Sequence, residues 1–160
     1  MRGKVALHDT DTQGLTMPQT PKFSGFADKI RASFARQDMM RTLGAELAEV
    51  SAGRVVITAP VLPDMRQQHG FAHAAVTFAI GDSAAGYAAL SLMEEADEVL
   101  TAEMKINLLA PAAGDRLIAT GRVVRAGRRL IVVSASVVAE GAGRSVEVAL
   151  LQGTMIPVQG

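Results

Sequence analysis

The sequence predicts an α+β fold in which an antiparallel sheet of five to six strands wraps around one long central helix. Three observations support this prediction. One segment of helical length is apolar on nearly every side, which is typical of a helix buried all round. Several later segments have the alternation or the Val-rich composition of strands, and the short turns that join them imply antiparallel pairing. The length of 160 residues suits a single domain.

The predicted central helix lies in the segment 71–92, which is rich in Ala and Gly. Gly81 and Gly86 stand inside it, although glycine in a helix costs roughly 1 kcal/mol relative to alanine. We therefore expect another part of the chain, such as the sheet, to pack very close to this helix. The segment is long enough to span a bilayer. Asp82 near its middle would cost roughly 2.5–3.5 kcal/mol on insertion, which favours a buried helix in a soluble protein.

The strand predicted at 99–109 has the most regular pattern of the chain. Apolar residues occupy the even positions from Leu100 to Leu108, and polar residues occupy the odd positions from Thr101 to Asn107. A period of two places one set on a buried face and the other on a polar face. The pattern therefore predicts that Leu100 and Leu108 face the core.

The remaining elements follow from shorter patterns. Residues 1–20 are polar and without a period, and we expect a mobile leader there, followed by a single domain over 21–158. Apolar spacings of three and four predict a first helix between Pro21 and Leu43, with Gly44 as its C-cap. The strands are predicted at 45–50, 54–61, 99–109, 117–125, 129–139 and 145–156.

Composition and charge exclude several classes of function. The 16 Lys and Arg balance 16 Asp and Glu, which argues against a nucleic-acid binder with a general basic surface. The absence of Cys excludes disulfides, zinc–thiolate sites, iron–sulfur clusters and a Cys nucleophile. His69 and His73 are four residues apart but lack the H-E-x-x-H pattern, so no metal site is predicted. No apolar signal segment opens the chain, so we expect a cytoplasmic protein that does not bind membranes.

Asp82 is the most informative candidate for chemistry, because burying an unpaired carboxylate is costly. It is either a structural residue bonded to a neighbouring hydroxyl or N–H, or a functional nucleophile or base. The polar loop 64–70 meets the start of the central helix, where unpaired N–H groups can form an oxyanion hole. His73 is either a helix-entry residue with a satisfied ring or part of that site. The basic tip at 127–129 is either a solvated turn or a site for an anionic tail.

These residues resemble a known pattern. The family of hotdog-fold acyl-CoA thioesterases carries N-x-x-G-x-x-H-G-G followed by D-x-A. The chain is similar to it over residues 67–75 and 82–84, through Gln67, Gly70, His73, Ala74, Ala75 and Asp82. Within the 4-hydroxybenzoyl-CoA thioesterase superfamily, the PaaI-like, or phenylacetate-degradation, branch is the most similar. The strand beginning at Thr101 continues the resemblance, which covers about residues 30 to 157.

The resemblance implies hydrolysis of the thioester of a small or medium acyl- or aryl-CoA, with no metal and no bound cofactor. It implies that Asp82 attacks the carbonyl or activates water. The N–H of Ala74, the residue after His73, would bind the thioester oxygen. Gln67 would orient the nucleophile or the water, and a hydroxyl from the partner subunit, Thr101, would position the water.

The resemblance also implies partners. The active site of the family is shared between two subunits, so a homodimer is required, and these dimers commonly pair into homotetramers. Coenzyme A carries phosphates, which cationic side chains at a pocket mouth bind through charge-assisted hydrogen bonds. The residues expected to contact coenzyme A are Gly70, Lys105, Arg125, Arg128 and Arg129.

Two departures from the family pattern keep other functions open. The Gly-Gly pair after the His is Ala74-Ala75 here, and the Asn is Gln67. We expect the backbone N–H of Ala74 to persist, because Ala suits a helix start. The alternatives are a non-catalytic acyl-CoA-binding or regulatory hotdog protein and, with less support, a hotdog hydratase. The hydratase lacks a convincing second acid or base beside Asp82.

Overall fold

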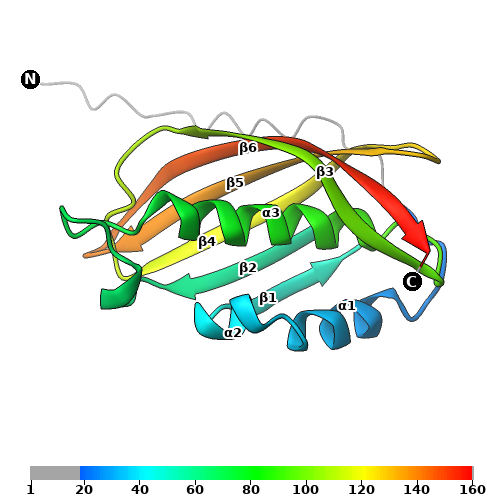
Figure 1. The fold of residues 1–160 in the computed structure, drawn as a ribbon, viewed down its shortest axis with the longest axis horizontal. Helices are drawn as coiled ribbons and strands as arrows, with labels where there is room; N and C mark the ends of the chain where they lie inside the picture. Colours follow the sequence, from blue (N-terminus) through cyan, green and yellow to red (C-terminus); the bar gives the residue numbers. More distant parts are fainter. Residues whose placement is uncertain (1–18, 160) are drawn as a thin grey trace, which may run out of the picture.

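The computed structural model describes residues 19–159, so most of the expected leader over 1–20 lies outside the described residues. A six-stranded antiparallel sheet curls around helix α3 (Ala74–Leu90), as Figure 1 shows, and this confirms the predicted α+β arrangement. The strand order is β1-β2-β4-β5-β6-β3, so β1 and β3 form the edges. The strands are β1 (Glu46–Ser51), β2 (Arg54–Pro60), β3 (Asp97–Leu108), β4 (Arg116–Ala126), β5 (Ile131–Gly141) and β6 (Arg144–Gln159).

The helical segment before the sheet is broken, although the sequence predicts one helix. It forms α1 (Phe26–Ala35) and α2 (Asp38–Thr42), separated at Gln37, whose backbone is extended. The Gln37 side chain bonds Tyr87 on α3, and this tertiary contact lies at the break. Gly44 ends α2 with φ +60°, a conformation that favours glycine, so the predicted C-cap is confirmed.

Close contact between α3 and the sheet explains much of the small-residue composition. At Gly121 in β4, an added Cβ would overlap the backbone carbonyl of Ala84, so the helix backbone lies directly on the strand. At Gly81, an added Cβ would lie 2.9 Å from the Leu151 side chain. At Gly86, the nearest atom is Cε of Met155, 3.9 Å away. The predicted tight packing is therefore confirmed at Gly81 and wrong at Gly86.

Strand β3 departs from its predicted alternation at both ends. Leu100 and Leu108 are 55% and 57% exposed, so the prediction that they face the core is wrong. On β6, Met155 pairs with Thr101 and Thr154 pairs with Glu103, which leaves one extra residue between them in a β-bulge. A bulge exchanges the faces of the residues before it, so Thr101 turns toward α3 and Leu100 turns outward. Leu108 ends the strand and lines an open cleft.

A short 3₁₀ helix, η1 (Pro63–Met65), interrupts the loop between β2 and α3. The far end of α3 is fixed by Ser91, whose hydroxyl donates to the Ala88 carbonyl and accepts from the Gly53 N–H at 2.7 Å. Across the described part of the chain, no helix is both long and apolar enough to cross a membrane.

We predict that Gly121→Ala destabilises the fold by about 1–3 kcal/mol or more, because the new methyl group must displace the backbone of α3. Thr120→Ala is the matched control, since Thr120 points to the other face of β4 and is half-buried. Chemical denaturation of both variants measures the difference. Equal stabilities would show that α3 and β4 are not in tight contact.

Candidate active site

Asp82 lies half-buried in the middle of α3, and its carboxylate has one hydrogen-bond donor among the described side chains. The Thr101 hydroxyl donates to Oδ1 of Asp82 at 2.9 Å. The same hydroxyl lies 3.4 Å from Sδ of Met155, which is a much weaker acceptor than a carboxylate. Burial raises the pKa of the Asp82 carboxyl, and the bond from Thr101 opposes that shift. The structure thus shows a hydroxyl partner for a carboxylate that is partly withdrawn from water.

The position of Thr101 corrects one expectation. The family resemblance implies that this hydroxyl comes from a partner subunit, but Thr101 reaches the Asp82 of its own chain. The bulge in β3 is the physical reason, because it turns Thr101 toward α3. The regular alternation from Leu100 to Leu108 does not indicate this bulge.

A small cavity opens beside Asp82, which we call the carboxylate cavity. Its volume is about 220 Å³, and α1, α3 and the first residues of β3 form its walls. Ser33, Gln37, Gly86 and Tyr87 line it, and none of these was predicted as a site residue. In the single helix predicted over this segment, the four-residue spacing would place Ser33 and Gln37 on one face, but α1 ends at Ala35 and Gln37 lies beyond it.

The Tyr87 hydroxyl fixes α1 to α3 at this cavity. Nε2 of Gln37 donates to it at 2.7 Å, and the Ser33 hydroxyl lies 3.2 Å away. The rings of Phe34 and Tyr87 pack in a tilted arrangement with centroids 6.0 Å apart. Burial raises the pKa of Tyr87, so the hydroxyl stays protonated. The outer wall of the cavity is therefore held by polar and aromatic contacts together.

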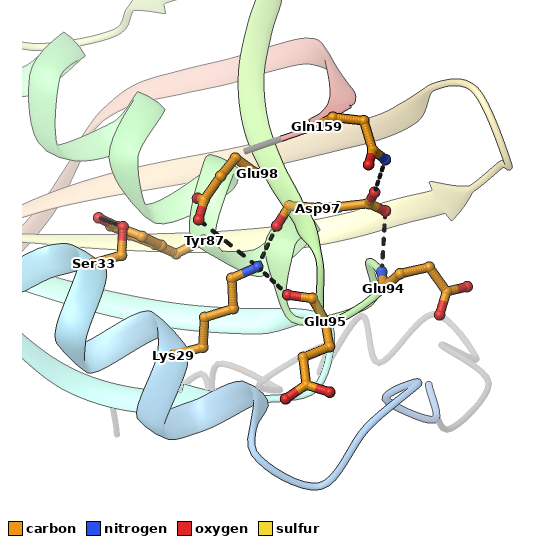
Figure 2. Close-up of polar contacts among 8 residues, drawn as sticks. All are labelled: Lys29, Ser33, Tyr87, Glu94, Glu95, Asp97, Glu98 and Gln159. Atoms are coloured by element: carbon orange, nitrogen blue, oxygen red, sulfur yellow. Dashed lines mark hydrogen bonds and ion pairs between the residues drawn. The ribbon is translucent and has the colours of Figure 1, made fainter.

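Lys29 fixes the other end of α1, as Figure 2 shows. Its ammonium group donates to the carbonyl of Glu95 at 2.8 Å and to the carbonyl of Asp97, and lies 3.9 Å from the Glu98 carboxylate. Its side chain is only 19% exposed. These contacts attach α1 to the loop that leads into β3, on the same side of the molecule as the carboxylate cavity.

His73 caps the start of α3. Its Nδ1 accepts a hydrogen bond from the Ala75 N–H at 3.0 Å, and its own N–H donates to the Met65 carbonyl at 2.8 Å. The position of His73 at the helix entry is therefore confirmed, with one nitrogen of its ring hydrogen-bonded. Within residues 19–159, no hydrogen bond uses the N–H of Ala74, the first residue of the helix. That N–H is available to a ligand.

The loop before His73 is shaped by Gln67 and Gly70. Oε1 of Gln67 accepts from the His69 N–H, and the NH₂ group of its amide remains for a substrate. The Gly70 N–H donates to the Gln67 carbonyl at 2.9 Å. Gly70 has φ +86°, and an added Cβ would meet no atom within 4 Å. Glycine is thus required here by backbone conformation, and its predicted contact with coenzyme A stays a prediction.

Gln67, His73 and Ala74 line a second cavity of about 510 Å³, which we call the helix-start cleft. Leu108 and the residues that follow it form its other side. Asp82 lies eight positions after Ala74 in the helix, a rise of about 12 Å. One thioester group cannot contact both residues in a single chain. The structure therefore brings the predicted catalytic residues together as two groups: Asp82 with Thr101, and Gln67 with His73 and Ala74.

The cationic residues expected to bind coenzyme A are not gathered in one cluster. Lys105 lies on the outer face of the sheet, in a hollow that Arg122 also lines. Arg125 is the next-to-last residue of β4, and Arg128 and Arg129 are exposed in the β4–β5 hairpin. Figure 1 shows this hairpin at the end of the sheet opposite the start of α3. Among the described residues, no three His, Asp or Glu side chains come close enough to hold a metal ion.

Comparison with known proteins identifies the family. Residues 69–146 match the sequence model of the thioesterase superfamily. A protein of Saccharolobus solfataricus whose name describes it as an esterase is 30% identical over 105 residues, which are 65% of this chain and 74% of that protein. The chain belongs to the thioesterase superfamily.

Solved structures place the thioesterase within that superfamily. A thioesterase family protein from Silicibacter pomeroyi is 44% identical, with a TM-score of 0.83, over 85% of this chain and all of that one. The PaaI protein of the phenylacetic acid degradation operon of E. coli is 25% identical, with a TM-score of 0.76, over 84% of this chain and 94% of that one. The thioesterase is therefore a hotdog-fold protein of the PaaI-like type.

We predict that Lys29→Met destabilises the thioesterase by about 1–3 kcal/mol, because it removes a charged donor from two carbonyl groups. Lys22→Met is the control. Lys22 forms an exposed ion pair with Glu94 at 2.7 Å, and such pairs contribute about 0–1 kcal/mol. Denaturation with urea compares the two variants. An equal loss in both would mean that Lys29 does not hold α1 in place.

Proposed function

We propose that the chain is an acyl-CoA thioesterase that hydrolyses the thioester of a small or medium acyl- or aryl-CoA, with Asp82 as the reacting carboxylate. The observation that carries the proposal is the half-buried Asp82 in the middle of α3, with a raised pKa and a cavity beside it. Its membership of the thioesterase superfamily supports the reaction type. A carboxylate that is partly desolvated is a stronger base and nucleophile than one in water.

The proposed reaction uses the ionised form of Asp82. The carboxylate attacks the thioester carbonyl carbon, or takes a proton from a water molecule that attacks it. The carbonyl oxygen becomes an oxyanion, and the free N–H of Ala74 at the positive end of α3 stabilises it. Collapse of this intermediate breaks the C–S bond and releases the coenzyme A thiolate. In the water route the acyl group leaves as the carboxylic acid, and the thiolate takes the proton that Asp82 removed from water. In the nucleophile route the thiolate takes a proton from water, and a second water molecule hydrolyses the mixed anhydride on Asp82 to the carboxylic acid and the free carboxylate. Thr101 holds Asp82 in place, and the NH₂ group of Gln67 orients the nucleophile or the water.

A homodimer would complete the active site. Strand β3 is an unpaired edge of the sheet, and exposed edge strands readily pair with another chain. Antiparallel pairing of β3 with its copy, centred near Glu103, places residues 98–101 of one chain opposite residues 105–108 of the other. Residues 98–101 line the carboxylate cavity, and Leu108 lines the helix-start cleft. The pairing thus joins the Asp82 of one protomer to the Ala74 of its partner.

Other parts of the proposal rest on the family resemblance. The dimers pair into homotetramers, the reaction uses no metal or bound cofactor, and the protein acts in the cytoplasm. Lys105, Arg125, Arg128 and Arg129 supply cations for the phosphates of coenzyme A through charge-assisted hydrogen bonds. A basic hairpin at the end of the sheet suits a phosphate-bearing tail that extends away from the thioester.

We predict that Asp82→Asn abolishes thiol release from acyl-CoAs while the protein remains folded. The wild type should lose activity as pH falls through a pKa above 3.8, because burial raises the pKa of Asp82 and protonation removes the nucleophile or base. The variant should be at least as stable as the wild type at pH 7, since ionised Asp82 carries a desolvation cost that disappears only at lower pH. A thiol-reactive dye with a panel from acetyl- to palmitoyl-CoA, including phenylacetyl- and hydroxybenzoyl-CoA, measures activity.

Asp28→Asn, on the exposed side of α1, is the control and should retain activity. Absence of thiol release by the wild type across the panel, with tight binding of acyl-CoA, would contradict the proposal and favour a non-catalytic acyl-CoA-binding protein. Addition of water to crotonyl-CoA without thiol release would favour a hydratase.

We predict that Ala74→Pro lowers kcat by about 10²–10³-fold, because it removes one oxyanion donor. Proline suits the first position of a helix, and His73 before it already has the extended backbone that proline requires, so the fold should be retained. Ala74→Ser keeps the N–H and is the control at the same position.

Mixing the Ala74→Pro and Asp82→Asn proteins tests the shared site. After subunit exchange, half of the dimers are mixed and each has one intact site, so activity should return to about a quarter of the wild type. No recovery after demonstrated exchange would mean that the two residues act within one chain.

A further inference from the structure

We propose that Gly86 determines the size of the acyl group that the enzyme accepts, and that the rigid wall formed by α1 limits the enzyme to small acyl groups. This inference rests on the proposed thioesterase function and assigns the carboxylate cavity to the acyl group. Gly86 lies one helical turn after Asp82, so the two residues share one face of α3. Both line the carboxylate cavity.

Packing against the sheet does not explain glycine at position 86. An added Cβ would lie 3.9 Å from Cε of Met155, which is an ordinary contact distance with the end of a flexible side chain. The backbone conformation gives no reason either, because Gly86 has helical geometry in the interior of α3. Glycine at such a position costs about 1 kcal/mol relative to alanine. The space that it leaves beside Asp82 is the feature that an alanine would remove.

Gly81 shows what a packing glycine looks like in the same helix. An added Cβ at Gly81 would lie 2.9 Å and 3.0 Å from the two terminal methyl groups of Leu151, and Gly81 does not line the carboxylate cavity. The two glycines are therefore retained for different reasons. The absence of a side chain at Gly81 leaves room for Leu151 of the sheet, and the absence of a side chain at Gly86 leaves room for a ligand.

The wall of the carboxylate cavity opposite Gly86 does not move readily to accommodate a larger acyl group. The Tyr87 hydroxyl is bonded to Gln37 and lies within hydrogen-bond distance of Ser33. Ile30, on the same helix α1, is fully buried, and Lys29 attaches that helix to the loop before β3. Moving α1 outward would break these contacts together. The cavity of about 220 Å³ is also smaller than the roughly 300–1,000 Å³ typical of drug-sized ligands.

Comparison of Gly86→Ala with Gly81→Ala tests the inference. For each protein, kcat/KM is measured by thiol release along a straight-chain series from acetyl- to octanoyl-CoA and for phenylacetyl-CoA, and Tm is measured by thermal unfolding. In Gly86→Ala, the ratio of kcat/KM for the largest accepted acyl group to that for acetyl-CoA should fall by about 10–200-fold, the effect of about one methylene group. Its Tm should equal or exceed that of the wild type. Gly81→Ala should lower Tm and leave the ratio unchanged.

Calorimetric binding of the same acyl-CoA series to the wild type and to Gly86→Ala separates this inference from the proposed function. If the wild type releases no thiol but Gly86→Ala weakens binding selectively for the larger acyl groups, the thioesterase proposal fails and the size-determining role stands. An unchanged size profile in a folded Gly86→Ala protein overturns the role of Gly86, whatever the activity. Failure of both proteins to bind any acyl-CoA overturns both proposals.

Discussion

The backbone contact between α3 and β4 is the constraint on which the rest of the structure depends. Because Gly121 has no side chain, the carbonyl of Ala84 lies directly on the strand, and the sheet can curl around the helix. Burial of the helix on nearly every side leaves few places where a polar residue of α3 can meet solvent. Asp82 occupies one of them, beside a cavity at the edge strand β3. The burial that stabilises the fold is also what raises the pKa of this carboxyl.

The bulge in β3 connects the fold to the candidate site. A regular strand would turn Leu100 toward the helix and Thr101 toward solvent. The extra residue reverses both, so a hydroxyl reaches Asp82 while an apolar side chain is left on an unpaired sheet edge. One local irregularity thus gives the carboxylate its donor and gives β3 an apolar edge suited to a second copy of the chain. Asp82 and Ala74 are too far apart along α3 to contact one thioester group. In the proposed reaction, this second copy of the chain therefore supplies the Ala74 N–H.

Helix α1 gives this thioesterase a rigid boundary on the acyl side of the proposed site. Its contacts, from Ser33 to Tyr87 and from Lys29 to the loop before β3, are directional, and they join segments more than 50 residues apart in the sequence. This fixed wall limits the volume of the carboxylate cavity, and the absence of a side chain at Gly86 on the opposite side adds to that volume. Substrate selection would then depend on residues that take no part in bond breaking.

The sequence by itself determined the central helix, the antiparallel strands and the family. These features depend on local periodicity and on the spacing of Gly70, His73 and Asp82. Both patterns can be seen in the sequence of a single chain. His73 as a helix cap could also be anticipated, because capping is local. The tertiary structure decided which residues surround Asp82. The bulge that turns Thr101 toward the carboxylate, the break in the first helix at Gln37, and the different roles of Gly81 and Gly86 all depend on long-range contacts. A pattern of polar and apolar residues along one chain does not encode such contacts, since strand pairing and close packing are settled only when distant segments meet.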